Sequence, residues 1–414
     1  MIERLLVRSE DALVGTLAQS RDGRFEFSYS GEWLARPHRF PISVSLPLHA
    51  PPAPGAAHAF FSNLLPESEL RRVLSQRLGI SADNDFELLA AIGGECAGAL
   101  TLSTGDEPDR ARAADYRPLT SEELETLAAA QVLPAIDGRS GLRLSLAGAQ
   151  DKLPVLVEGT SLLLPIGSSP STHILKFPNR HYKHLPGNEV LTMTIAAHLG
   201  LPVARTELWE LRREGMCVVE RYDRVRDASG AVRRLHQEDL CQVLGLRSTM
   251  KYQKEGGPSF TRCFEAVREV SAQPLVDGQN LLKWIAFNTI ALNADGHAKN
   301  LSLLYTESGL RLAPFYDLVC TRAYPRLAPE LAMSIGDEFD PTLVRRSHWE
   351  QVARELGLGV RFVLGTVREM AERLPEAADA AAAEFRSRYG ERPALQLVLP
   401  KIRRQAKRVA QLAA

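Results

Sequence analysis

The 414-residue chain is poor in cysteine and has no excess of charge of either sign. Its five cysteines lie far apart and no two have zinc-site or redox spacing, so we expect buried thiols in a reducing, cytoplasmic setting. The 50 basic and 50 acidic residues cancel, which excludes a global field drawing the chain onto nucleic acid or an anionic membrane. Charges interrupt the first ten positions, and no uncharged run reaches the roughly 20 residues that span a bilayer, so neither a signal peptide nor a membrane helix is predicted.

The composition indicates a folded protein of more than one domain. Hydrophobic residues make up 45% of the chain and charged residues 24%, as in an ordinary globular protein. At roughly 150 residues per domain, this length predicts two or three domains. We place a β-rich subdomain at 1–110, a mixed region at 111–225 and a helical region at 226–414.

Local patterns in the first third of the chain indicate both strands and helices. Apolar and polar residues alternate around Asp22-Gly23, a dipeptide suited to a tight β-hairpin turn. Thr120 and Glu123 form a capping box, which predicts a helix over 121–130. We also expect a helix at 63–78 and a linker at 103–118.

Strand-like patterns give way to helical ones further along. Ser347 and Glu350 match a second capping box, and helical periodicity dominates after it. The last expected helix, 400–412, is basic, which is more often a solvated face than a phosphate-binding one. The other expected elements are strands within 142–177 and 208–220 and helices at 189–199 and 281–292.

The residues that kinases use for phosphoryl transfer occur in the required order. Such enzymes need a carboxylate beside the attacking hydroxyl and oxygen ligands for the metal that binds the phosphates. Asp295 precedes Asn300 by five residues, the spacing of a kinase catalytic loop, so we expect a base and a metal ligand. Asp317 follows two short apolar segments, 301–305 and 310–313, which predict a hairpin that would bring this second metal ligand beside the loop.

Upstream residues fit the remaining parts of a nucleotide site. Lys176 ends a strand-like run from which it could reach phosphates, and Glu189 on the next predicted helix could pair with it. Glu220 and Tyr222 follow another apolar strand and are candidates for a hinge whose backbone holds adenine.

Residues 145–152 supply small side chains where a backbone could approach phosphate. They lack the full glycine-rich signature of protein kinases. A P-loop ATPase is disfavoured because Lys152 is followed by Leu153 and not by Ser or Thr.

Taken in order, these motifs resemble the HipA family of toxin kinases over nearly the whole chain, from Phe60-Phe61-Ser62-Asn63 to Asp317. The resemblance implies an α+β, protein-kinase-like fold of the HipA type, with a small β-rich N-terminal lobe and a helical C-terminal lobe. The strongest blocks are 145–152, 172–176, 188–189, 219–224, 236–239, Lys251-Tyr252, 295–300 and 316–317.

The function implied by the resemblance is that of a serine/threonine protein kinase in a toxin–antitoxin module. Such a kinase uses ATP and Mg²⁺, autophosphorylates on a loop serine, here Ser145, and is thereby switched off. Its substrate class is aminoacyl-tRNA synthetases, glutamyl-tRNA synthetase in particular, whose loss arrests translation and favours dormancy. Its partner is a small HipB-like helix-turn-helix antitoxin, through which alone it reaches operator DNA.

The resemblance also assigns roles to individual positions. Asp295 would be the catalytic base, and Asn300 and Asp317 would bind the metal. Gly296 departs from the pattern, because many relatives carry a second acidic residue there. The ATP contacts would be Ala147, Gly148, Ala149, Gln150, Asp151, Lys152, Lys176, Glu220, Arg221, Tyr222, His297, Ala298, Lys299, Asn300, Tyr316 and Asp317.

Two other functions use the same residues or the same fold. A small-molecule kinase shares the Asp295, Asn300 and Asp317 arrangement but does not need the Ser145 loop or the N-terminal β-rich region. A catalytically idle co-repressor would only stiffen an antitoxin on its operator and would not need Lys176 beside the other three residues. Single positions also have structural readings: His297 as a loop brace, Glu189 as a local ion pair and Tyr222 as a packed aromatic.

Overall fold

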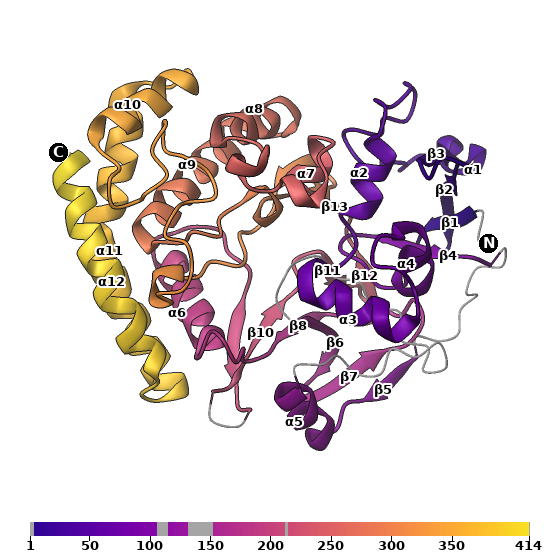
Figure 1. The fold of residues 1–414 in the computed structure, drawn as a ribbon, viewed down its shortest axis with the longest axis horizontal. Coiled ribbons are helices and arrows are strands. Elements are labelled where there is room, and N and C mark those ends of the chain that lie inside the picture. Colours follow the sequence, from indigo (N-terminus) through magenta and orange to yellow (C-terminus); the bar gives the residue numbers. More distant parts are fainter. Residues whose placement is uncertain (1–3, 106–114, 131–151, 212–213, 414) are drawn as a thin grey trace. The chain divides into compact units, whose positions relative to one another are not determined.

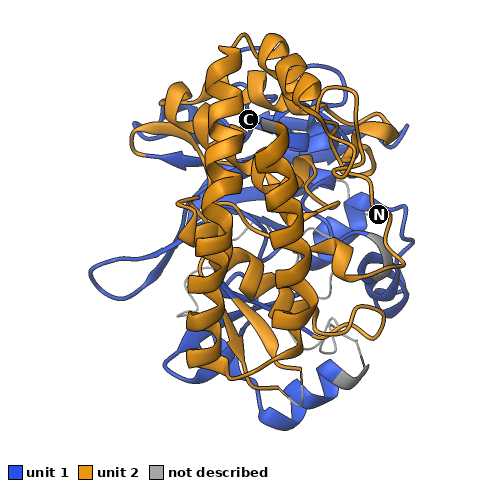
Figure 2. Cartoon of the chain, turned by 90° about the vertical axis from the view of Figure 1, so that its left-hand side faces the viewer, with its two compact units in different colours: residues 1–177, 219–248, 304–306 blue, residues 178–218, 249–303, 307–414 orange. Residues whose placement is uncertain are grey.

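The computed structural model describes residues 4–105, 115–130, 152–211 and 214–413. They belong to two compact units, drawn in blue and orange in Figure 2. Unit 1 comprises residues 1–177, 219–248 and 304–306, and unit 2 comprises 178–218, 249–303 and 307–414. The division into 1–110, 111–225 and 226–414 stays a prediction.

A four-stranded antiparallel sheet with the order β3-β2-β1-β4 begins unit 1. Its hairpin joins β2 (Ala12–Gln19) to β3 (Phe25–Tyr29), and Gly23 has the positive φ of +80° that such a turn requires. The hairpin expected at Asp22-Gly23 is therefore confirmed. The neighbouring strands are β1 (Arg4–Ser9) and β4 (Leu100–Ser103).

One of the two helices predicted in unit 1 is confirmed, and the other begins later than expected. Helix α5 (Ser121–Ala130) has the expected capping box, since Glu123 N–H donates to the Thr120 hydroxyl at 3.2 Å. The helix expected at 63–78 is wrong at its start, because Pro66 disfavours helical geometry in the residue before it. The other helices are α1 (Gly31–Ala35), α2 (Ala56–Ser62), α3 (Ser68–Leu78), α4 (Asp85–Ile92) and α7 (Leu240–Val243).

Unit 1 also carries the strands in the order β5-β7-β6-β8. Strands β6 (Lys152–Glu158) and β8 (His173–Lys176) pair antiparallel with Lys152 opposite Lys176. The linker expected at 103–118 is wrong at its end, since β5 (Tyr116–Pro118) pairs with β7 (Ser161–Pro165). Further strands are β9 (Thr206–Trp209) in unit 2, β10 (Met216–Glu220), which runs from unit 2 into unit 1, and β11 (Arg224–Arg226), β12 (Val232–Arg234) and β13 (Gln237–Asp239) in unit 1.

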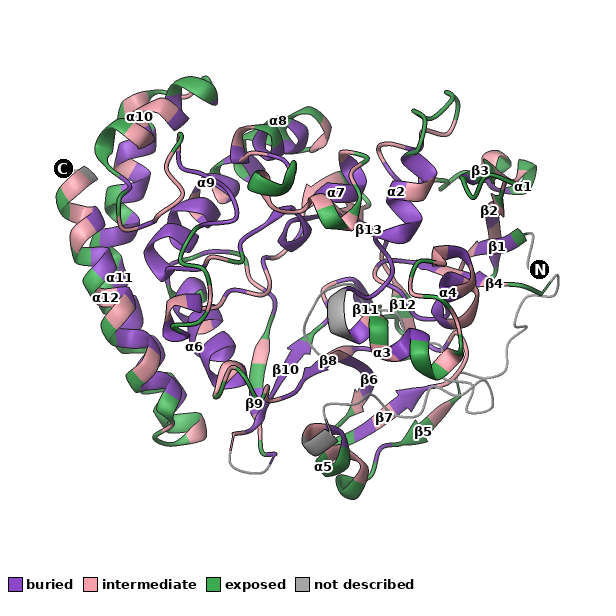
Figure 3. Cartoon of the chain, viewed as in Figure 1, coloured by how far each residue is buried: buried purple, intermediate pink, exposed green. Residues whose placement is uncertain are grey.

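Unit 2 is mainly helical (Figure 1). Helix α9 is buried along most of its length, with Trp284 and Phe287 fully buried, whereas α11 and α12 alternate buried and exposed positions (Figure 3). This pattern makes α9 the central helix and the α11–α12 pair an outer layer of the unit. The helices are α6 (Leu185–His198), α8 (Phe260–Val270), α9 (Pro274–Ala291), α10 (Arg346–Glu355), α11 (Val360–Tyr389) and α12 (Pro393–Ala413).

Several boundaries in this unit differ from the sequence expectation. The second capping box is wrong, because α10 is capped by Arg345 and Ser347 lies inside the helix. Helix α12 begins at Pro393, so Pro400 lies within it. The hairpin expected before Asp317 is confirmed as β14 (Ser302–Thr306) and β15 (Gly309–Leu312).

All five cysteines are buried and free, as expected. Within the described ranges, no helix is both long and apolar enough to cross a membrane.

Candidate active site

The loop after α9 is held in place by buried amides and a hydroxyl. The helix ends at Ala291 and is capped by Leu292, which has a left-handed φ of +57° and turns the chain toward Asp295. Asn293 donates to the Asn288 side chain at 2.7 Å and accepts from Asp295 N–H at 3.1 Å. Thr321 accepts from Ala294 N–H at 2.8 Å, and His297 N–H donates to the Asp295 carbonyl at 3.0 Å, so the backbone on both sides of the candidate base is fixed.

Asp295 points its carboxylate toward solvent while one oxygen stays engaged. Its side chain is 56% exposed, and the Tyr252 hydroxyl donates to Oδ1. His297 Nε2 lies 3.8 Å from the same oxygen, and the Tyr252 and His297 rings meet edge to face at 5.1 Å between centroids. This arrangement leaves Oδ2, for which the described residues provide no hydrogen-bond donor, to face an incoming hydroxyl.

The departure at Gly296 has a steric reason. A Cβ at this position would lie 3.1 Å from Cγ of Asn288, closer than most real Cβ contacts. Asn288 is the residue that holds Asn293, so a side chain at 296 would press on the support of the loop. In this chain the glycine is part of how Asp295 is positioned.

Asn300 closes the short helical turn η3 (Ala298–Asn300) and is 4% exposed. Its side-chain oxygen accepts from His297 N–H at 3.3 Å, and its own N–H donates to the His297 carbonyl at 2.9 Å. Both hydrogen bonds use the main chain of His297, so the ATP contact and the bracing role expected for its side chain both stay predictions. An amide oxygen has two lone pairs, so Asn300 retains capacity for a metal ligand.

The segment that carries Asp317 is joined to the same loop. Tyr316 donates to the Lys299 carbonyl at 2.6 Å, and its hydroxyl lies 2.8 Å from that of Ser302. Asp317 itself has a φ of +56°, a left-handed conformation that costs a non-glycine residue about 1 kcal/mol or more and that is most often kept at functional positions. Unit 2 thus brings the Asn300 and Asp317 segments together.

Oxygen donors of this kind suit Mg²⁺. The ion prefers carboxylate and amide oxygens, and in phosphoryl-transfer sites it takes one or two protein ligands, with phosphates and water completing the shell. No group of three His, Cys, Asp or Glu side chains within the described ranges could hold a metal alone. Asn300 and Asp317 would therefore hold the ion together with a bound nucleotide.

Unit 1 contains the other candidate nucleotide residues. Lys176 ends β8 and is 3% exposed, and Lys152 faces it across the strand pair. Glu220 is exposed at the end of β10, and the Tyr222 hydroxyl donates to the Gln237 side chain, which makes Tyr222 more than a packed aromatic. Gln237 also donates to Asp223 at 3.0 Å, so it links the hinge segment to a buried charge cluster.

The side chain of Arg221 takes part in this buried charge cluster. Arg221 pairs with Glu95 at 2.9 Å and with Asp223 at 2.8 Å, and Arg224 pairs with Glu95 at 2.8 Å. Burial alone would raise the pKa of Glu95, but the guanidinium groups of Arg224, Arg234 and Arg221 outweigh burial and hold that pKa at about 2. The Arg221 N–H donates to the Thr172 carbonyl at 2.9 Å, and the Arg221 carbonyl accepts from Arg224 N–H at 3.3 Å, so only the second lone pair of that carbonyl could serve adenine.

The remaining expected residues are not brought together by the structure. Ser145, Ala147, Gly148, Ala149, Gln150 and Asp151 lie outside the described residues. Glu189 is buried on α6 in unit 2 whereas Lys176 belongs to unit 1, so their pairing stays a prediction. Three supporting residues, Tyr252, Gln237 and Glu95, were not expected from the sequence. Tyr252 and Gln237 nevertheless lie within sequence segments that resemble the HipA family.

Comparison with known proteins shows which family the chain resembles. Residues 5–103 match the family model of the HipA N-terminal domain, and residues 144–378 match that of the HipA-like C-terminal domain. Protein Y4mE of Sinorhizobium fredii is 42% identical over 371 residues, 88% of each chain. The serine/threonine-protein kinase toxin HipA of Shewanella oneidensis is 33% identical over 384 residues, which cover 89% of this chain and 86% of that one.

A solved structure of the Shewanella oneidensis HipA, HipB and operator DNA complex contains a chain with a similar fold. The similarity covers 99% of this chain and 98% of that one, with a TM-score of 0.87 and 30% sequence identity. The α+β, kinase-like fold expected from the sequence is thereby confirmed. Two family models and relatives of this coverage establish that the chain belongs to the HipA family of toxin kinases.

Proposed function

We propose that the protein is an ATP-dependent serine/threonine protein kinase, the toxin of a toxin–antitoxin pair, and that it is inactivated by autophosphorylation on Ser145. The observation that carries this proposal is the loop of unit 2, where an exposed, oriented Asp295 lies on the same short segment as buried Asn300. The Tyr316 hydrogen bond then ties the Asp317 segment to that loop. Membership of the HipA family supports the same activity.

Asp295 acts as the base for the substrate hydroxyl. Tyr252 donates to Oδ1 and fixes the rotation of the carboxylate, so Oδ2 accepts the proton as the hydroxyl oxygen attacks. Because Asn293 accepts from Asp295 N–H on one side and His297 N–H donates to the Asp295 carbonyl on the other, the carboxylate needs little reorganisation during the step.

In unit 2, Asn300 and Asp317 would hold Mg²⁺, and in unit 1, Lys176 and Lys152 would attract phosphates. When bound, Mg-ATP supplies the phosphoryl group and neutralises charge in its transfer. The carbonyls of Glu220 and Arg221 would serve adenine at the hinge, while Gln237 accepts the hydrogen bond that keeps Tyr222 in position. The protein contributes orientation and charge, which is most of what phosphoryl transfer needs.

The partner we propose is a helix-turn-helix antitoxin of the HipB kind, with operator DNA bound through it. The Shewanella relative was solved with HipB and operator DNA, and the similarity extends over nearly its whole chain. The substrate class we propose is aminoacyl-tRNA synthetases, with glutamyl-tRNA synthetase as the first candidate. This substrate rests on the family resemblance alone.

The decisive experiment is phosphate incorporation from Mg-ATP, followed by intact mass and peptide mapping. Wild type should gain one phosphate on Ser145, and Asp295→Asn should lower the rate by about 10²–10⁴-fold because the base is lost. Asp317→Asn should lower it similarly through weaker metal binding, and Ser145→Ala should gain none.

A matched control is Asp379→Asn, which removes an exposed carboxylate on α11. This variant should incorporate phosphate at the wild-type rate. If wild type phosphorylates neither itself nor any of a panel of synthetases, yet transfers phosphate to small hydroxyl compounds, the chain is a small-molecule kinase. If it binds Mg-ATP and transfers to nothing, the co-repressor function replaces the proposal.

A further inference from the structure

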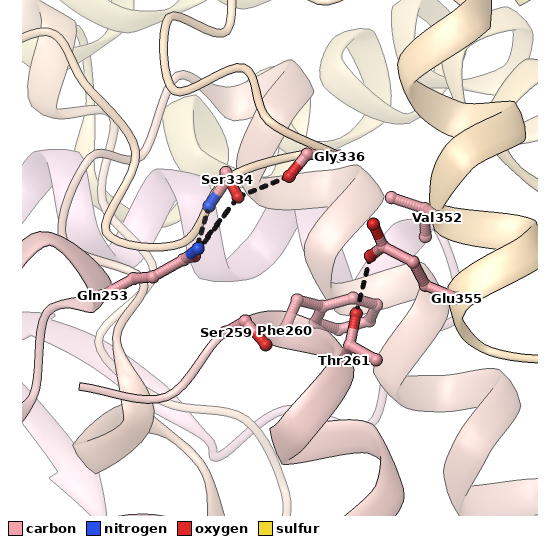
Figure 4. A pocket seen from close by; sticks show the side chains of 8 residues that line it. All are labelled: Gln253, Ser259, Phe260, Thr261, Ser334, Gly336, Val352 and Glu355. Carbon is pink, nitrogen blue, oxygen red and sulfur yellow. Dashed lines mark hydrogen bonds between the residues drawn. The ribbon is translucent and has the colours of Figure 1, made fainter. Parts of the chain in front are cut away.

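A polar cavity of about 320 Å³ opens in unit 2 between the start of α8, the end of α10 and the segment around Ser334 (Figure 4). This is the low end of the range for small-molecule pockets, and suits one long side chain. The lining residues are Gln253, Ser259, Phe260, Thr261, Ser334, Gly336, Val352 and Glu355.

The lining contains one charged group, the carboxylate of Glu355, and no basic side chain. Thr261 donates to Oε2 of Glu355 at 2.9 Å and Gln351 donates to Oε1 at 2.9 Å, so both oxygens are oriented. Each oxygen keeps a second lone pair, and a carboxylate presented in this way matches a guanidinium or ammonium group. Buried Phe260 and Val352 provide apolar surface for the methylene stem of such a side chain.

The cavity is connected to Asp295 by two consecutive residues. Tyr252 donates to the Asp295 carboxylate, and Gln253, the next residue, lines the cavity. Gln253 also holds the opposite wall, since its side-chain oxygen accepts from Ser334 N–H at 2.9 Å. A path through one tyrosine side chain and one peptide unit is on the order of 10 Å and ends at the Gln253 wall of the cavity. An extended peptide at roughly 3.3–3.6 Å per residue covers that path in about three residues, and a long side chain would then enter the cavity from there.

We propose that this cavity binds an arginine or lysine side chain of the protein substrate, located about two to four residues from the hydroxyl that Asp295 deprotonates. The inference rests on the proposed kinase function and deepens it, because it names a sequence requirement for the substrate. Glu355 makes the ion pair and the Phe260 wall packs against the stem. The hydroxyls of Ser259 and Ser334 accept further hydrogen bonds from the cationic group.

The chain's own proposed target meets this requirement. The sequence around Ser145 reads Arg143-Leu144-Ser145, which places a basic residue two positions before the acceptor serine. A second copy of the chain could therefore present this segment to the cavity as a substrate.

A synthetic peptide of residues 141–150 contains one serine and one arginine and tests the inference directly. The enzyme is the full chain carrying Ser145→Ala, so that all phosphate incorporated belongs to the peptide. Replacing the peptide arginine (Arg143→Ala) should raise KM about tenfold and leave the KM for ATP unchanged. Glu355→Gln in the enzyme should raise KM for the unmodified peptide by a similar factor and have little further effect on the peptide without arginine.

A charge exchange separates recognition from structural damage. The enzyme variant Glu355→Arg should phosphorylate the original peptide poorly and recover several-fold with the Arg143→Glu peptide. Glu369→Gln, which changes an exposed glutamate on α11, is the matched control and should behave as wild type. No recovery in the exchanged pair, together with equal KM values for peptides with and without arginine, would overturn the inference while the kinase function stands.

Binding measurements keep the two hypotheses distinguishable. Fluorescence anisotropy of the labelled peptide with the Asp295→Asn, Ser145→Ala chain reports the cavity without catalysis. If wild type phosphorylates no protein or peptide, the proposed function fails. The cavity then stands as a basic-peptide site only if Glu355→Gln weakens this binding, and it falls if binding is unchanged.

Discussion

At the scale of single residues, Tyr252 supports the proposed catalytic carboxylate of Asp295, a contact that the sequence did not reveal. Its hydroxyl donates to Asp295 Oδ1, and its ring meets His297 edge to face. A hydrogen bond to a charged group contributes about 1.5–3 kcal/mol, and this one fixes which oxygen faces the substrate. We therefore expect Tyr252 to act on the proposed reaction through Asp295.

We expect Tyr252→Phe to lower kcat for peptide phosphorylation by about 10–100-fold, the loss of one such hydrogen bond at 1.4 kcal/mol per tenfold. The KM for ATP should stay within about twofold, since Tyr252 belongs to neither candidate nucleotide segment. Steady-state kinetics with varied ATP would measure both constants.

The control for this substitution is Tyr389→Phe, which removes a buried hydroxyl at the end of α11. It should leave kcat unchanged. A kcat for Tyr252→Phe equal to that of wild type would mean that the contact with Asp295 has no part in the reaction.

Residue spacing singled out three residues of the candidate site and none of the contacts that support them. Asp295, Asn300 and Asp317 stand out because a local loop and a hairpin impose their separation along the chain. Glu95, in contrast, meets Arg221 and Arg224 across more than a hundred residues of sequence. No periodicity or motif encodes such a contact, so it emerges only from the folded chain.

At the scale of elements, this Glu95 cluster joins the end of α4 to β11 and β12. Glu95 is fully buried and pairs with Arg221, Arg224 and Arg234. Removing one partner of a buried pair costs about 3–5 kcal/mol because the remaining charges are left uncompensated. We therefore expect Glu95→Gln to lower the urea midpoint of unit 1 strongly at pH 7.

The pH dependence of this effect has a definite sign. The pKa of Glu95 is about 2 in the fold against an ordinary 4.5, so its stabilisation is present above pH 4.5 and is lost as the pH falls toward 2. The difference corresponds to about 3 kcal/mol at 1.36 kcal/mol per unit. Urea titrations from pH 7 to pH 3 should show a decline in wild type that is reduced in Glu95→Gln.

Glu10→Gln is the comparison, because Glu10 pairs with Arg233 on the surface. Exposed pairs contribute about 0–1 kcal/mol, so its midpoint should follow wild type at every pH. Equal midpoints for Glu95→Gln and Glu10→Gln would show that the cluster does not stabilise unit 1.

Elements with local signals were predicted best. Helix α5 matches its expected bounds because the capping box that starts it lies within four consecutive residues. Helix α9 begins at Pro274, earlier than its apolar pattern indicated, because Leu275 and Val276 are exposed in its first turn. Helix α12 continues through Pro400, where the sequence predicted that the helix begins.

At the scale of the whole molecule, the balance of charge determines how strongly the chain alone can bind DNA. The chain has 50 basic and 50 acidic residues, and the most basic element is α12. Within it, Arg403 pairs with Asp379, Lys401 donates to the Leu397 carbonyl and Arg408 donates to the Pro341 carbonyl. This leaves Arg404 and Lys407 as the exposed cations of the helix, too few for a phosphate-binding surface.

We therefore expect the protein alone to bind operator DNA weakly and without sequence preference. Two phosphate contacts give a slope of log K against log salt of about −1.8, at −0.9 per contact. Anisotropy titrations of labelled operator between 50 and 200 mM salt, roughly the range over which such slopes are read, would measure it. Adding the antitoxin should steepen the slope to the antitoxin's own value. Arg404→Glu with Lys407→Glu should then leave the affinity of the ternary complex unchanged, whereas a loss of several-fold would show that α12 contacts the DNA directly.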